Sequence, residues 1–422
     1  MKQGNALSLA TEHSRSMPKG WEMKKLGEVA KAIYGYTEKA SFEEIGPRFL
    51  RITDIQDEGV NWETVPFCKI TDTDFNKYKL IDGDIVFART GATTGKSYLV
   101  NNPPKSVFAS YLIKVHINSG GLLPEYLFLF FQTKTYWDSI NEGISGSAQG
   151  GFNATKLSDL YIPLPPLPEQ QRIVAILDEA FAGIAKAKAN AEQNLKNAKE
   201  LFESYLQGVF KSKIEGDDSS TLDSLCELIV DCEHKTAPTQ ETGYPSIRTP
   251  NIGKGELILE NVNRVSYETY VQWTRRAIPK AGDLILAREA PAGNIAVIPE
   301  NIEVCLGQRT VLIRPKKDKL VSKYLAYLIL SKDVQEKLLS HSTGATVEHV
   351  NMKDIRAFKI YNLSNITEQQ AIVRKLDTLS AETKRLEAIY QQKINDLEEL
   401  KKSVLQKAFS GELKTEKAEV TL

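Results

Sequence analysis

The segment 91–97, which reads GATTGKS, contains the residue types of a phosphate-binding loop. In nucleotide-hydrolysing proteins such a loop holds phosphate oxygens with glycine amides and a lysine, but its glycines lie one residue farther apart than Gly91 and Gly95. A related segment, 287–294, reads AREAPAGN and contains no lysine. We therefore interpret 91–97 as a turn that uses glycine for positive φ, and nucleotide hydrolysis is not indicated.

The sequence matches other catalytic motifs only in part or not at all. The run NPPK at 102–105 resembles the Asn-Pro-Pro-aromatic loop of amino-group methyltransferases, but it lacks the aromatic ring that would stack on a flipped base. The five histidines form no HExxH set, and the four cysteines form no CxxC pair. The sequence therefore predicts no catalytic residue, no bound cofactor and no metal site.

Several polar residues instead recur in loops at corresponding places of the two halves of the chain. Arg89 and Arg288 each end an apolar run, and Asn153 and Asn351 each follow a loop rich in glycine and small polar residues. Arginine beside such residues can contact phosphate oxygens through its fork and through exposed backbone amides. A repeated arginine can equally belong to a structural ion pair, so both roles stay open.

The whole chain consists of two copies of one unit. EQQRIV at 169–174 returns as EQQAIV at 368–373, and GDIVFAR at 83–89 returns as GDLILAR at 282–288. These units exceed the length of solenoid repeats, which is roughly 20 to 50 residues. The sequence predicts a duplicated domain and a pseudo-twofold internal repeat, which suits a ligand with two similar ends.

The composition is that of a soluble globular protein of 422 residues, with 41% hydrophobic and 26% charged residues. Because 54 basic residues balance 54 acidic ones, total charge alone cannot bind nucleic acid, although a local basic groove can. No run approaches the ~18 apolar residues of a membrane span, and 1–20 lacks a signal sequence. We expect a cytoplasmic protein without membrane contact.

Each half is predicted to be a mixed α/β or α+β domain followed by a long helix. From Pro168 the apolar residues follow the three-four spacing of a coiled coil, and a helix over 168–211 would be about 65 Å long. The second helix is expected to begin at Thr367 with a capping box to Gln370. The seams comprise Leu177, Phe181, Ile184, Ala191, Leu195, Ala198, Phe202, Tyr205 and Val209, and Leu379, Thr383, Leu386, Tyr390, Leu397, Leu400, Val404 and Ala408.

The two helices are expected to pack antiparallel, because each seam alone would expose an apolar stripe to water. Gly411 is placed to stop the second helix, and Phe409 should then lie near Leu26. We expect two globular domains at opposite ends of this helical rod.

This plan resembles the specificity subunit of type I restriction-modification enzymes. PLPEQQRIV at 166–174 is similar to the opening of that family's central helix, and DCEHKT at 231–236 followed by IRTPNI at 247–252 resembles the start of many of its target-recognition domains. The chain departs from the pattern with NIT at 365–367 and with YGYTEK at 34–39.

The resemblance implies a DNA sequence-specificity subunit, in which each globular domain reads one half of a bipartite target in double-stranded DNA. It implies target-recognition domains at 1–166 and 213–366, a central helix at 167–212 and a second helix with a tail at 367–422. The helices would set the spacing and dock two modification subunits, which carry the methyltransferase chemistry, and a motor-nuclease restriction subunit would join for cleavage. The chain itself would be non-catalytic.

Residues in the loops and strand ends of both domains are predicted to contact DNA, and base edges would be read where the two copies differ. In the first domain these are Tyr36, Thr37, Lys39, Arg51, Arg89, Thr90, Lys96, Ser147, Gln149 and Asn153; in the second they are His234, Lys235, Arg248, Asn251, Arg288, Arg309, Thr346, His349 and Asn351.

A different class of protein fits the same pattern. A non-catalytic coiled-coil scaffold with two adaptor heads would bind other proteins, and its neutral charge would need no further explanation. A continuous basic concavity would distinguish the DNA-reading protein from this alternative.

Overall fold

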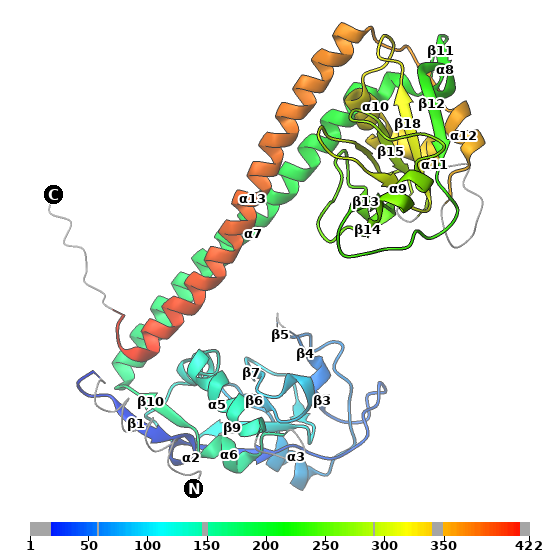
Figure 1. The fold of residues 1–422 in the computed structure, drawn as a ribbon. Coiled ribbons are helices and arrows are strands. Elements are labelled where there is room, and N and C mark those ends of the chain that lie inside the picture. Colours follow the sequence, from blue (N-terminus) through cyan, green and yellow to red (C-terminus); the bar gives the residue numbers. More distant parts are fainter. Residues whose placement is uncertain (1–17, 57–58, 146–150, 290–291, 340–348, 414–422) are drawn as a thin grey trace, which may run out of the picture. The chain divides into compact units, whose positions relative to one another are not determined.

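The computed structural model describes most of the chain (Figure 1). The described residues are 18–56, 59–145, 151–289, 292–339 and 349–413. None of the helices in these ranges is both long and apolar enough to cross a membrane.

The chain divides into two compact units, and each unit contains one globular domain with segments of both long helices. The first unit comprises 1–190 with 393–422, and the second comprises 191–392. The long helices are α7 (Leu167–Phe210) and α13 (Ile366–Ser410).

The first domain is built on a four-stranded antiparallel sheet of order β2-β9-β6-β7. These strands are β2 (Ala30–Tyr34), β9 (Leu112–Ile117), β6 (Ile85–Ala88) and β7 (Ser97–Leu99). All residues of β6 are buried because both faces of the sheet are covered. Ile85 and Phe87 join one apolar cluster, whereas Val86 and Ala88 join another on the opposite face.

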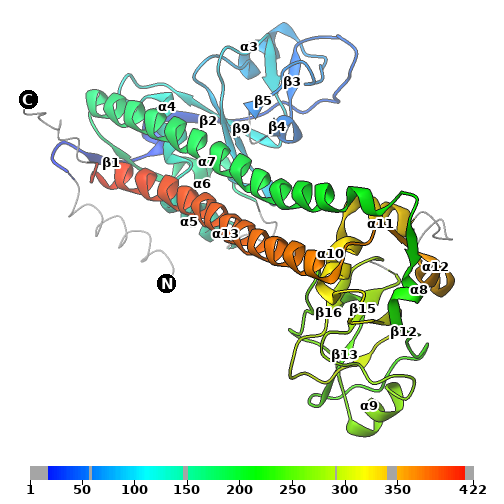
Figure 2. The same ribbon diagram turned by 90° about the horizontal axis from the view of Figure 1, so that it is seen from above.

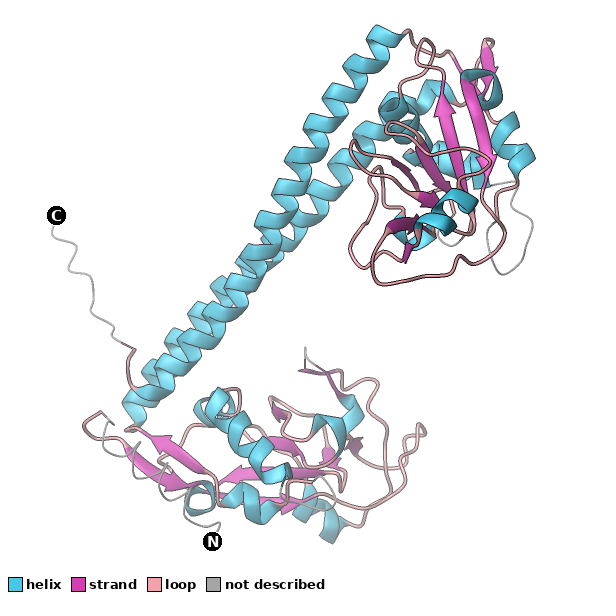
Figure 3. Cartoon of the chain, in the orientation of Figure 1, coloured by secondary structure: helices cyan, strands magenta, loops and turns pink. Residues whose placement is uncertain are grey.

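Most helices of this domain pack on one face of the sheet, and a second small sheet lies near the other (Figure 3). The domain's helices are α2 (Leu26–Val29), α3 (Asp72–Tyr78), α4 (Pro124–Phe130), α5 (Lys134–Ser145) and α6 (Ala154–Ser158). The remaining strands are β1 (Glu22–Lys25), β3 (Arg48–Leu50), β4 (Ile55–Gln56), β5 (Gly59–Val60), β8 (Ser106–Phe108) and β10 (Tyr161–Leu164). β3 pairs with β8 in parallel, and β1 pairs with β10 antiparallel, so the domain's first strand is tied to its last.

The second domain repeats this topology. Its main sheet has the order β12-β18-β15-β16, and β13 pairs with β17 in parallel as β3 does with β8. The strands are β11 (Ser219–Thr221), β12 (Cys226–Asp231), β13 (Tyr244–Ile247), β14 (Arg264–Val265), β15 (Leu284–Ala287), β16 (Ile295–Val297), β17 (Cys305–Leu306), β18 (Thr310–Pro315) and β19 (Lys359–Tyr361). The helices are α8 (Leu222–Leu225), α9 (Tyr267–Trp273), α10 (Ser322–Leu330), α11 (Lys332–Leu339) and α12 (Met352–Ala357). The predicted duplication of a mixed helix and strand domain is confirmed.

Within each unit, the segments of α7 and α13 lie side by side and run in opposite directions (Figure 2). In the first unit Lys401 of α13 lies over the Phe181 ring of α7 at 4.8 Å, and Lys188 of α7 pairs with Glu398 of α13 at 2.7 Å. A later residue of α7 thus contacts an earlier residue of α13, as in antiparallel helices. The antiparallel pairing expected from the two seams is confirmed within each unit.

The expected seam holds for α7 and is wrong at one position of α13. Leu400 is 48% exposed, whereas Thr383, Ile394 and Leu405 are buried. These three buried positions are spaced eleven residues apart, which corresponds to about 3.67 residues per turn rather than to heptads.

The expected start of α13 is also wrong. The helix begins at Ile366, one residue before Thr367. Asn365 caps it instead, because its Oδ1 atom accepts the Glu368 N–H at 3.0 Å.

The last aromatic residue of each long helix packs on a tyrosine of the domain in its own unit. The ring centroids of Phe409 and Tyr126 are 4.9 Å apart, and those of Phe210 and Tyr324 are 5.1 Å apart. Phe409 also packs against the apolar cluster that contains Leu26, as the sequence predicted.

A buried glutamine fixes the beginning of each long helix. Gln170 and Gln369 are both fully buried. The Oε1 atom of Gln369 accepts from the Val321 N–H at 2.8 Å, and its Nε2 atom donates to the carbonyls of Lys319 and Ser364 at 2.9 and 2.8 Å. Gln170 makes the same three bonds, with the N–H of Leu123 and the carbonyls of Gly121 and Pro165. The repeated Glu-Gln-Gln run therefore encodes a joint between helix and domain.

Replacing Gln369 with alanine should destabilise the second unit. The change leaves up to three backbone groups without a partner, and each such group costs about 1 to 3 kcal/mol when it is buried. We expect the thermal unfolding transition of the full chain to begin at a lower temperature. Gln193→Ala, on an exposed face of α7, is the control and should alter stability by no more than about 0.5 kcal/mol. Equal unfolding temperatures for the two variants would contradict the stabilising role of Gln369.

Candidate nucleic-acid interface

In the second domain, the end of β15 is followed by a buried arginine. Arg288 is 7% exposed, and its Nη1 atom donates to both carboxylate oxygens of Asp231 at 2.9 and 2.8 Å. Its Nε atom donates to the Val350 carbonyl at 2.9 Å. These bonds join the ends of β12 and β15 to the segment that precedes α12.

The polar contacts continue from Arg288 to the surface. The Nη2 atom of Arg288 lies 2.9 Å from Nε2 of His349, whose Nδ1 atom lies 2.9 Å from Oε1 of Glu289. Glu289 in turn pairs with the Nε atom of Arg309 at 2.8 Å. Because arginine can only donate, Nε2 of His349 accepts and Nδ1 donates to the carboxylate. We call Asp231, Arg288, Glu289, Arg309 and His349 the Arg288 network.

Exposed basic side chains lie beside this network. His234 lies 3.2 Å from Asp231 through Nε2, and Glu233 pairs with Arg275 at 3.0 Å and Arg276 at 3.4 Å. The side chains of these three basic residues are 67%, 59% and 44% exposed. Together with the network, these pairs place the acidic groups in partly buried positions and the basic groups at the surface.

The first domain has the same backbone frame with different side chains. The Arg89 N–H donates to the Tyr111 carbonyl, as the Arg288 N–H donates to that of Arg309. The guanidinium of Arg89 lies over the ring of Tyr34 at 5.1 Å, and its Nε atom is buried without a hydrogen-bond partner among the described residues. The two repeated arginines therefore have different surroundings.

The sequence left two roles open for the repeated arginines. The structure favours the structural role for Arg288, because its guanidinium is buried and satisfied by Asp231, Val350 and His349. The DNA contact predicted for Arg89 stays a prediction.

The residues that follow the repeated arginines also differ between the two domains. Thr90 follows Arg89, whereas Glu289 follows Arg288. Thr90 is half-buried and makes no side-chain cap to the short helical turn that comes after it. The first domain therefore lacks the carboxylate that holds Arg309 in the second.

Other predicted residues of the first domain have structural contacts or are exposed. Arg51 pairs with Asp54 through Nη2 at 2.7 Å, and Tyr36 packs on Tyr78 with ring centroids 5.2 Å apart. Asn153 caps α6 by accepting the Lys156 N–H at 2.8 Å. The exposed predicted residues are Thr37, Lys39 and Lys96. Ser147 and Gln149 lie outside the described residues.

The second domain divides its predicted residues in a similar way. Asn251 accepts the backbone N–H of Arg248 at 3.2 Å and donates to the Ile258 carbonyl, so it shapes the turn. Asn351 donates to Asp354 at 3.3 Å at the start of α12. The exposed predicted residues are His234, Lys235, Arg248 and Arg309. Thr346 lies outside the described residues.

Sequence reasoning missed the two carboxylates of the network and the exposed tyrosine of the first domain. Asp231 and Glu289 bind Arg288 and Arg309, and Tyr111 is 60% exposed at the position that corresponds to Arg309. The available signal was that a glutamate directly follows the repeated arginine in one copy and not in the other.

The cysteines are buried thiols. All four are unpaired, and burial raises the pKa of Cys68 and Cys305 to about 11 and that of Cys226 to about 12. A raised pKa keeps a thiol protonated and poorly nucleophilic. Within the described ranges, no group of three or more His, Cys, Asp and Glu side chains could hold a metal ion.

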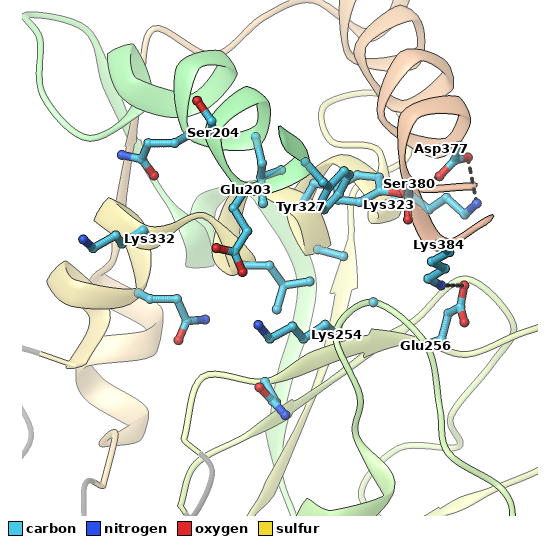
Figure 4. A pocket seen from close by; sticks show the side chains of 18 of the residues that line it. Glu203, Ser204, Lys254, Glu256, Lys323, Tyr327, Lys332, Asp377, Ser380 and Lys384 are labelled. Carbon is cyan, nitrogen blue, oxygen red and sulfur yellow. Dashed lines mark hydrogen bonds and ion pairs between the residues drawn. The ribbon is translucent and has the colours of Figure 1, made fainter. Parts of the chain in front are cut away.

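The second unit also contains a groove of about 660 Å³ beside the long helices (Figure 4). Its apolar lining includes Phe202 and Leu206 of α7 and Leu330 of α10. Charged pairs border it, with Lys323 bound to Asp377 at 2.8 Å and Lys384 near Glu256 at 3.5 Å. Residues of both long helices and of the domain of this unit therefore line the groove.

Comparison with known proteins defines the class of this chain. The family model described as type I restriction modification DNA specificity domain matches residues 18–196 and 216–399. The chain belongs to this family, as the resemblance in its sequence implied.

Two curated relatives show how far the similarity extends. The chain is 25% identical over 420 residues to the putative type I restriction enzyme MjaX specificity subunit of Methanocaldococcus jannaschii, covering 94% of this chain and 95% of the relative. It is 25% identical over 311 residues to the EcoBI specificity subunit of Escherichia coli, covering 68% and 65%.

Solved structures share the fold. A chain from a study of complex assembly and conformational transition of the type I R-M system has a TM-score of 0.72 at 22% identity, covering 94% of this chain and 99% of that one. The HsdS subunit from Thermoanaerobacter tengcongensis has a TM-score of 0.60 at 21% identity, covering 94% and 98%.

Replacing Arg288 with alanine should destabilise the second domain, because it leaves the carboxylate of Asp231 without its main partner. Breaking a buried pair costs about 3 to 5 kcal/mol, and partial exposure of Asp231 should reduce this to about 2 kcal/mol. Urea unfolding of the full chain measures the change. Arg275→Ala removes an exposed pair and serves as the control, with an expected change below about 1 kcal/mol. Equal urea midpoints for the Arg288→Ala and Arg275→Ala variants would contradict a structural role for Arg288.

Proposed function

We propose that this specificity subunit reads a bipartite target in double-stranded DNA, with one half-site for each globular domain. The observation that carries the proposal is the duplicated backbone frame around Arg89 and Arg288, on which the two copies place different side chains. A common frame gives both domains the same approach to the duplex. Different side chains on it give each domain its own base preference.

The local charge supports a DNA contact despite a net charge of zero. In the second domain, exposed Arg309 belongs to the Arg288 network, and exposed Arg275 and Arg276 pair with Glu233, two residues from Asp231. Exposed His234 lies 3.2 Å from Asp231, and exposed Lys235 follows it in the chain. Cations at such a surface neutralise phosphates, and their effect depends on position rather than on total charge. The protein-interaction scaffold is not favoured, because the chain belongs to a DNA specificity family.

The chain contributes recognition in this proposal, and its partners contribute catalysis. Two modification subunits would supply the methyltransferase chemistry, a motor-nuclease subunit would join for cleavage, and the assembly would work in the cytoplasm. The recognition domains would span 1–166 and 213–366. The helices at 167–212 and 367–422 would set the spacing between half-sites and dock the modification subunits.

Two features of the described residues suit this docking role. Ala182, Ala185 and Ala189 are exposed on α7, so partner helices can approach its backbone closely. The groove beside Phe202 and Leu206 offers an apolar floor with a charged border, the arrangement of a protein interface with a hydrophobic centre and a polar rim.

Exchange of one domain should change one half of the DNA target. Replacing residues 21–165 with the first domain of another family member should alter one half of the methylated motif and leave the other half unchanged. Methylome sequencing of a host that carries the native or the exchanged chain, together with the same modification subunits, measures both halves. A host without the chain is the control and should lack the motif. A change in both halves would contradict the proposal that each domain recognises one half-site.

Blocking the groove should weaken binding of the modification subunits. Ser204 lies on the groove wall and is exposed, so Ser204→Trp should fill part of the space without disturbing the core. We expect about a tenfold loss of affinity, which equals about 1.4 kcal/mol, in titration calorimetry with purified modification subunits. Glu260→Trp, on an exposed loop of the same domain, is the control. Unchanged affinity for Ser204→Trp would exclude the groove from the interface.

A further inference from the structure

Arg309 and Tyr111 occupy the same place in the two copies. Each offers its backbone carbonyl to the N–H of the repeated arginine, at 2.9 Å for Arg288 and 3.2 Å for Arg89. The Arg309 side chain is 61% exposed, and Tyr111 is 60% exposed. The same backbone hydrogen bond is therefore followed by an exposed guanidinium in the second domain and by an exposed phenol ring in the first.

The orientation of Arg309 is imposed by its surroundings. Its φ angle is 67°, in the left-handed region that residues other than glycine seldom adopt. The Nε atom is held by Glu289, and Glu289 is held by His349, which contacts buried Arg288. An exposed arginine usually samples many rotamers, so a chain of contacts that reaches the domain interior selects one direction for this one.

The remaining donors of Arg309 match a particular base edge. The pair with Glu289 uses Nε, and the two terminal amino groups form the fork of the guanidinium. In the major groove, such a fork fits the O6 and N7 acceptors of guanine. A preset orientation lowers the conformational cost of making both bonds at once.

The corresponding surface of the first domain suits a different contact. Tyr111 has no carboxylate at the adjoining position, where Thr90 replaces Glu289, and nearby Arg89 lies over the Tyr34 ring at 5.1 Å. Tyr34 is itself 43% exposed. An aromatic surface of this kind favours apolar contact with a base edge over a charged bidentate bond.

Resting on the proposed function, we propose that Arg309 and Tyr111 are the matched specificity-determining residues of the two domains. Arg309 binds a guanine of the second domain's half-site through O6 and N7. Tyr111 makes an apolar contact in the first domain's half-site. Glu289 and His349 are positioning residues, which act on the DNA only through Arg309.

Base substitution in the DNA tests the assignment of Arg309. The full chain, assembled with its modification subunits, is titrated with duplexes that carry the native bipartite target changed at one base pair at a time. The native chain should discriminate against replacement of one guanine by roughly 5- to 150-fold. Arg309→Ala and Arg309→Lys should both lose that discrimination, because lysine keeps the charge and lacks the fork. Discrimination in the other half-site should not change.

The same measurement tests the roles of Tyr111 and Glu289. Tyr111→Ala should reduce discrimination at one position of the opposite half-site only. Glu289→Ala should reduce the discrimination that Arg309 provides without lowering affinity for unrelated duplexes, a pattern that general loss of folding would not produce. Arg275→Ala, an exposed cation outside the network, should lower affinity for all duplexes equally.

The outcomes separate the inference from the function on which it rests. If the native complex prefers a bipartite target and Arg309→Ala discriminates at every position as the native chain does, the assignment is overturned while the proposed function stands. If Arg309→Ala changes discrimination in both half-sites, the assignment to one domain is overturned. If the native complex shows no target preference at all, the proposed function itself fails.

Discussion

The buried amide groups of Gln170 and Gln369 fix how each long helix leaves its domain. A primary amide inside a protein is stable only when its donors and acceptor are bonded, and here three backbone groups satisfy each one. At the other end of each helix, Phe210 or Phe409 packs on a tyrosine of a domain. Each domain therefore contacts the beginning of one long helix through a buried glutamine and the end of the other through a phenylalanine. The chain contains the Glu-Gln-Gln run twice because each domain needs this joint.

The duplication and the long helices could be predicted from the sequence because burial leaves a periodic record. The run at Ile85–Ala88 is apolar throughout because both faces of its sheet are covered, and its copy at Leu284–Ala287 has the same cause. The details of α13 could not be predicted in this way. Three- and four-residue steps are compatible with several registers over many turns, and only packing against α7 buries Ile394 and exposes Leu400.

The site shows a different limit of sequence reasoning. Arg89 and Arg288 are the same residue at the same place in the repeat, but their partners come from distant parts of the chain. Asp231 and His349, which bind Arg288, are 57 and 61 residues away from it. No local spacing records such contacts, so the sequence could identify the repeated arginines but could not decide that Arg288 is an internal ion-pair residue.

The neutral net charge is consistent with DNA recognition because the basic side chains around the Arg288 network are more exposed than the acidic ones. Asp231 and Glu289 are paired with arginines and lie partly buried, whereas Arg275, Arg276 and Arg309 are exposed. The carboxylates hold the arginines in place, and the ion pairs of these three arginines each leave part of the guanidinium exposed. The hydrogen bond from the repeated arginine reaches only the backbone of Tyr111 or Arg309, so the side chains at this position can differ, but the φ of 67° at Arg309 disfavours β-branched residues there. Under the proposed function, duplication of this hydrogen-bonded frame would allow each domain to change its base preference independently, which a single continuous recognition surface could not do.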